Sequence, residues 1–110
     1  MKNFIQRGQV ITAIAPYSLT SGQGVKVGAL FGVASSHAVT NSEVEVVREG
    51  VFELAAVTSE SAAIGAKIYW DDTARRLTTT AGGNLLVGAL ARQKTGVEQT
   101  AYALLDGGIR

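Results

Sequence analysis

The sequence predicts a small all-β domain, either a barrel or a sandwich, built of short antiparallel strands with glycine-rich turns. Three observations support this class. Apolar and polar residues alternate with a period of two in the middle of the chain, as in half-buried strands. Glycine makes up 13 of the 110 residues, whereas an average protein of this length has about 8, or about 7%. Turn signals recur at short intervals, which is typical of sandwiches and barrels.

The first strands are expected near the N-terminus. Residues 10–14 form an apolar, β-branched run, preceded by Phe4-Ile5, and a polar, glycine-containing loop follows at 16–24. Residues 25–34 are apolar, with glycines at positions 24, 28 and 32. Three glycines would cost an exposed helix about 3 kcal/mol relative to alanine. We therefore interpret this stretch as strand–turn–strand, followed by a loop at 35–42.

Residues 43–54 show the strongest strand pattern. Glu43 and Glu45 alternate with valines, and after Gly50 the apolar Phe52 and Leu54 also alternate. This predicts apolar side chains facing inward and acidic ones outward. Arg48-Glu49-Gly50 is expected to be a hairpin turn or a bulge between two strands.

The second half of the chain is a series of strands and turns. A short helical turn or a loop is expected at 58–64, and residues 107–110 read as a flexible tail. The sequence Val-Gly-Ala-Leu occurs twice, at 27–30 and 87–90, either as two equivalent strands of a barrel or by chance. Further strands are expected at residues 66–70, 75–80, 85–91 and 100–105, with turns at 71–74, 81–84 and 95–98.

Composition restricts the class of protein. Hydrophobic residues are 46% and charged residues 17%, so residues 1–110 are expected to fold as a single β-rich domain. Ten basic and nine acidic side chains nearly cancel, which gives no electrostatic signature of nucleic-acid or membrane binding. The absence of cysteine removes thiolate and zinc–thiolate chemistry. No signal peptide or membrane span is predicted, so synthesis in the cytoplasm is expected.

No constellation of residues predicts an enzyme. The single histidine, His37, reads as a solvated loop residue, and the glycine run around Lys26 lacks the order of a phosphate-binding loop. Asp71-Asp72 is interpreted as turn-capping rather than metal-binding, because no third carboxylate stands at useful spacing. We expect no catalytic residue, no cofactor and no metal.

Several residues instead suggest contacts with protein. The pair Glu43 and Glu45 is either a solvated strand face or a partner for arginines of a neighbouring subunit. Aromatic residues fill cores and also anchor interfaces, so Trp70 is assigned to the core with an interface role left open. An apolar N-terminal segment, residues 1–7, is expected to act as an arm across a neighbour.

The chain resembles a family of small tailed-bacteriophage proteins, the capsid cement or head-decoration proteins, over nearly its whole length. The order and spacing of several segments carry this resemblance. They are residues 4–8 (FIQRG), 28–34 (GALFGVA), 49–54 (EGVFEL), 65–72 (GAKIYWDD), 77–80 (LTTT) and 83–88 (GNLLVG).

The resemblance implies a structural virion protein, made in the host cytoplasm, that binds the outer surface of a phage capsid. There it would stabilise the shell by bridging capsomers. The implied partners are the major capsid protein and further copies of the chain itself, as a homotrimer, with no nucleic acid or membrane. An alternative is a phage or cell-surface binding module that recognises a glycan or a receptor. The residues expected at a protein interface are Phe4, Ile5, Arg7, Tyr69 and Trp70.

Overall fold

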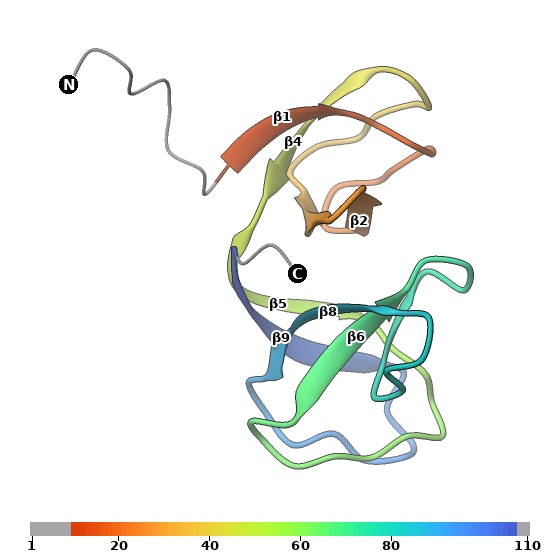
Figure 1. Cartoon of the computed structure of the whole chain (residues 1–110), viewed down its shortest axis with the longest axis vertical. Coiled ribbons are helices and arrows are strands. Elements are labelled where there is room, and N and C mark those ends of the chain that lie inside the picture. The colour runs from red at the N-terminus through yellow and green to blue at the C-terminus, as the bar shows by residue number, and fades with distance from the viewer. Residues whose placement is uncertain (1–9, 108–110) are drawn as a thin grey trace, which may run out of the picture.

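The computed structural model describes residues 10–107, which form nine β-strands and no helix (Figure 1). The predicted all-β class is confirmed, and the predicted strands within this range start and end within one or two residues of the observed ones. Phe4-Ile5 and residues 108–110 lie outside the described part. The strands are β1 Val10–Ile14, β2 Gly24–Val27, β3 Leu30–Ala34, β4 Glu43–Val47, β5 Glu49–Ala55, β6 Lys67–Asp71, β7 Arg76–Thr78, β8 Leu85–Leu90 and β9 Thr100–Asp106.

The strands form two antiparallel sheets. The first sheet has the order β1-β4-β3-β2, and the second has the order β5-β9-β8-β6-β7 (Figure 1). The second sheet curls into a half-barrel, because β7 returns to the end of β5. There Ala56 and Leu77 form a parallel bridge, and the Val57 N–H donates to the Leu77 carbonyl at 3.0 Å. The architecture is thus two sheets, one of which curls so that its first and last strands meet.

The chain passes from the first sheet to the second at a single residue, Arg48. The prediction of a hairpin turn or bulge at this point is wrong, because β4 pairs with β1 and β3 whereas β5 pairs with β9. The alternating pattern on both sides of Arg48 is correct, since Val44 and Val46 are buried in one sheet and Leu54 in the other. Alternation fixes which side chains point inward, but it carries no information about the pairing partner.

The repeated Val-Gly-Ala-Leu does not mark two equivalent strands. The copy at 27–30 is a hairpin turn in which Val27 pairs with Leu30 and Gly28 has φ of 60°. A positive φ at the first central position of a two-residue hairpin favours glycine. The copy at 87–90 lies inside β8. The segment 58–64 is a loop rather than a helical turn.

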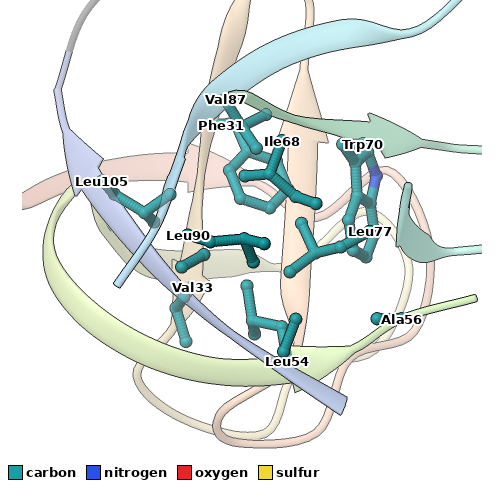
Figure 2. Close-up of a cluster of buried hydrophobic side chains, with 12 residues drawn as sticks. Phe31, Val33, Leu54, Ala56, Ile68, Trp70, Leu77, Val87, Leu90 and Leu105 are labelled. Carbon is teal, nitrogen blue, oxygen red and sulfur yellow. The ribbon is translucent and has the colours of Figure 1, made fainter. Parts of the chain in front are cut away.

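The buried side chains form two clusters that meet at β3. The larger cluster lines the concave side of the second sheet and contains Leu77, Leu90 and Leu105 (Figure 2). Phe31 and Val33 project into it from β3, although β3 belongs to the first sheet. The two sheets therefore share buried contacts instead of packing as separate units.

Trp70 is the centre of these shared contacts. It is 2% exposed, and its ring centroid lies 4.9 Å from that of Phe31 (Figure 2). Its Nε1–H donates to Asp72 Oδ1 at 2.9 Å. On the first sheet, Gly24 faces the indole so closely that an added Cβ would lie 2.8 Å from Trp70 Cη2. The prediction that Trp70 belongs to the core is confirmed.

Replacing Gly24 with alanine should destabilise the fold by about 1–3 kcal/mol, because the new methyl group overlaps a ring that is packed on all sides. Urea unfolding at neutral pH measures this. The matched control is Gly82→Ala, where an added Cβ meets nothing within 4 Å and stability should stay constant or rise by up to about 1 kcal/mol. Equal stability of the two variants would contradict the proposed packing of the indole against β2.

Candidate protein-interaction surfaces

Of the residues predicted at an interface, Trp70 and Tyr69 lie in the part of the chain that the structure describes. Phe4, Ile5 and Arg7 fall outside the described residues. Trp70 points into the shared core, and its neighbour Tyr69 faces the opposite, outer side of the second sheet, where it is half-buried beside Leu86. An interface role for these residues stays a prediction.

A polar network joins the two sheets at the edge of the core. Asp72 Oδ1 accepts hydrogen bonds from Tyr17 Oη and Trp70 Nε1, both at 2.9 Å. The Tyr17 hydroxyl oxygen also accepts the Lys26 N–H at 3.2 Å, and the Arg75 guanidinium lies 3.4 Å from the centre of the Tyr17 ring. Burial raises the pKa of Tyr17, the Lys26 N–H lowers it, and the Asp72 carboxylate raises it again. Tyr17 is therefore protonated and able to donate at neutral pH.

The residues considered for catalysis, phosphate binding or metal binding lie in turns, loops and strands. The Asp71 carboxylate accepts the backbone N–H groups of Thr73 and Ala74, as predicted for a turn cap. His37 is exposed in the loop between β3 and β4, as predicted. The glycine run around Lys26 forms β2 and its hairpin, with no helix after it. Across residues 10–107, no three metal-ligating side chains gather in one place.

An exposed apolar stripe crosses the outer face of the second sheet. We call the residues Val51, Leu104, Ala89, Leu86 and Tyr69 the outer stripe. Val51 is opposite Leu104, and Leu104 is opposite Ala89. Leu86, three residues before Ala89 on β8, is opposite Tyr69 of β6. Val51 is 53% and Leu104 48% exposed, and a hollow of about 220 Å³ lies beside Leu104 and Leu86. Contiguous apolar patches of this kind mark interaction surfaces.

Two adjoining loops at one end of the half-barrel carry the exposed large apolar side chains Ile64 and Val97. Ala62 and Lys94 exchange backbone hydrogen bonds of 2.9 and 3.0 Å between these loops. Lys94 is 3% exposed, and its Nζ donates to the carbonyls of Glu60 and Thr95 at 2.7 and 3.2 Å. Sequence reasoning missed this lysine, because nothing in its neighbourhood distinguishes it from a solvated one.

Glu60 fastens the same loop to the end of β7. Its carboxylate accepts the Thr78 hydroxyl and the Thr79 N–H, each at 2.8 Å. Partial burial acts to raise the pKa of Glu60, but the hydrogen bonds from Thr79, Thr78 and Thr80 outweigh it and lower the pKa. The loop is therefore held in place by an ionised carboxylate at neutral pH.

Two acidic side chains lie on the face of the first sheet that also carries Val33. Glu43 and Glu45 are exposed on β4 and lie opposite Ile14 and Thr12 of β1. Within the described residues neither carboxylate forms an ion pair or a hydrogen bond. A hollow of about 570 Å³ lies here, lined by Thr12, Ser35, Ser36, Glu43, Val44 and Glu45.

A comparison with family models matches the chain to the phage cement protein family over residues 5–105. No curated protein and no solved structure matches the chain. Within residues 10–107 there is no helix long and apolar enough to cross a membrane.

Glu60→Gln should lower stability by about 1 kcal/mol at pH 7, because the hydrogen bonds to a charged acceptor weaken. The lowered pKa of Glu60 in the fold means that its contribution is present above the pKa of the unfolded chain, about 4.3. It is lost as the pH falls through the folded pKa. Urea unfolding at pH 7 and pH 3 should show the variant and the parent converging in acid.

Glu43→Gln is the matched control for this measurement, because its carboxylate is exposed and forms no hydrogen bond among the described residues. We expect a change within about 0.5 kcal/mol at both pH values. A constant difference between the Glu60 variant and the parent across this range would contradict the role given to the ionised carboxylate.

Proposed function

The chain belongs to the phage cement protein family, and we propose that it binds the outer surface of a phage capsid and bridges neighbouring capsomers. The match to the family over residues 5–105 carries this proposal. Association with a phage capsid as a structural protein follows from the family. The outer surface, the bridging and the identity of the capsid partner are the proposed parts.

The energetics of a repeated shell suit this role. Anything that binds the assembled state and not its separated parts stabilises it, by about 2.7 kcal/mol per site when the ligand is at 100 times its Kd. A capsid offers many equivalent sites, so small contributions from each copy sum to a large one. Bridging adds avidity, since a copy attached to one capsomer meets the next at high effective concentration.

A bridge between capsomers needs two contact surfaces held at a fixed distance, and the two sheets provide them. The two sheets are held together by the shared core and by the Asp72 network, so contacts made by one sheet lie at a fixed distance from contacts made by the other. The near balance of ten basic and nine acidic residues allows copies to pack side by side without strong repulsion.

The proposed partners are the major capsid protein and other copies of this chain. A homotrimer would present three identical surfaces at once and gain from multivalency. Sedimentation equilibrium of the free protein tests this part by itself. A trimer has three times the 11.4 kDa mass of the chain, and a monomer at all concentrations would remove it from the proposal.

Three of the aromatic residues, Trp70, Tyr17 and Tyr102, are engaged within the chain, which argues against a glycan-binding site built on them. Sugar recognition would use an exposed aromatic face, but Trp70 is 2% exposed. The ring of Tyr17 is covered by Arg75 at 3.4 Å, and that of Tyr102 by Arg92 at 4.3 Å. These faces are occupied by contacts within the chain.

Purified protein mixed with phage heads assembled without it should co-sediment with the heads up to a fixed saturating ratio. It should also raise the temperature at which the heads break, because bound copies resist separation of capsomers. Heads of an unrelated phage are the control and should bind none. If neither expanded nor unexpanded heads bind the protein, the proposed function is wrong.

A further inference from the structure

Among the described residues, β1 is an edge strand without the usual protection. It is the terminal strand of the first sheet, and its sequence, Val-Ile-Thr-Ala-Ile, has no charge, proline or glycine. Natural edge strands are normally shielded by such residues, because an open edge pairs with other chains. The second sheet differs, since its terminal strands β5 and β7 are joined by the bridge at Ala56.

The hydrogen-bond pattern identifies the backbone groups on the open edge. The Ala15 N–H donates to Ser42 on the β4 side at 2.8 Å, while the Glu45 carbonyl accepts from Ser35 on the β3 side at 3.0 Å. Bonded and non-bonded pairs alternate along an antiparallel ladder. Thr12, which is opposite Glu45, therefore directs its N–H and carbonyl away from β4, as do Val10 and Ile14.

The side chains beside this edge form an apolar–polar–apolar row. Val10 is 39% and Ile14 54% exposed, and Thr12 is the smaller residue between them. Thr12 borders the hollow of about 570 Å³ that also contains Glu43 and Glu45. A strand added to β1 would lie two strand spacings, about 10 Å, from β4. A long cationic side chain opposite Thr12 would cross that gap and meet the carboxylates.

We propose that the open edge of β1 binds an extended segment of the capsid protein by strand addition. The segment would have a basic residue opposite Thr12 and apolar residues two positions to either side. Backbone hydrogen bonds supply the affinity, and the alternate side chains supply the specificity. The inference rests on the proposed function, because it assigns the surface through which the capsid is recognised.

Thr12→Pro tests the edge directly. Proline removes an N–H that points away from β4, so the ladder between β1 and β4 is retained, as on the solvent side of natural edge strands. We expect an unchanged far-ultraviolet spectrum and at least tenfold weaker binding to heads. Thr12→Val is the matched control, because it keeps both the shape and the N–H, and it should bind within threefold of the parent. Equal binding by the parent and the folded proline variant would overturn the proposal.

Charge reversal gives a second test if the proline variant fails to fold. Glu45→Lys should weaken binding to heads at least tenfold, and added salt should reduce the difference. Glu53→Lys makes the same charge change on the exposed face of β5, where it removes the hydrogen bond from the Thr100 hydroxyl but no contact of β1, and it should bind like the parent. Equal losses in the two lysine variants would contradict a basic partner at β1.

Two further outcomes would assign the edge to another occupant and overturn the proposal. If Thr12→Pro alters the sedimentation mass of the free protein, a second copy covers β1. If the amide hydrogens of Val10, Thr12 and Ile14, which point away from β4, exchange slowly in the free monomer, the chain covers its own edge. Failure of the parent protein to bind heads is a separate result, since it removes the proposed function and not the edge assignment alone.

Discussion

The packing of Trp70 between the two sheets is the constraint on which the rest of the structure depends. The chain crosses from the first sheet to the second only once, at Arg48, so covalent geometry alone would let the sheets turn relative to each other. Phe31, Gly24 and the Asp72 carboxylate each meet the indole from a defined direction. Asp72 accepts hydrogen bonds from both the indole N–H of Trp70 and the Tyr17 hydroxyl. The same carboxylate therefore satisfies the buried N–H and links the two sheets. These contacts fix how the second sheet lies against the first.

Sequence patterns predict the strands of this fold well and their arrangement poorly. The alternation in 43–54 and the turn residues around Asp71 are local properties, and both lie where the patterns place them. The change of sheet at Arg48 depends on partners distant in sequence, which a period of two cannot reveal. Lys94 is missed for the same reason, since the carbonyl of Glu60 that it binds is brought to it only by folding. Among the predicted interface residues, Trp70 and Tyr69 are adjacent in sequence but face opposite sides of the sheet.

The terminal strands of the second sheet are bridged to each other, whereas within residues 10–107 β1 at the end of the first sheet is open to another chain. The half-barrel joins its own terminal strands and leaves side chains, notably the outer stripe, as its exposed apolar surface. The first sheet ends on the uncharged β1 beside two carboxylates without partners among the described residues. A structural protein that acts only in an assembly can retain such an edge, because the assembly covers it. The membership in the phage cement protein family identifies the assembly as a phage capsid.

Electron cryomicroscopy of heads decorated with this protein tests the central claim most directly. The account predicts density on the outer surface of the shell into which both sheets fit as one rigid body, with each copy contacting two capsomers. Density inside the shell, contact with a single capsomer, or sheets turned relative to each other about Arg48 would contradict it.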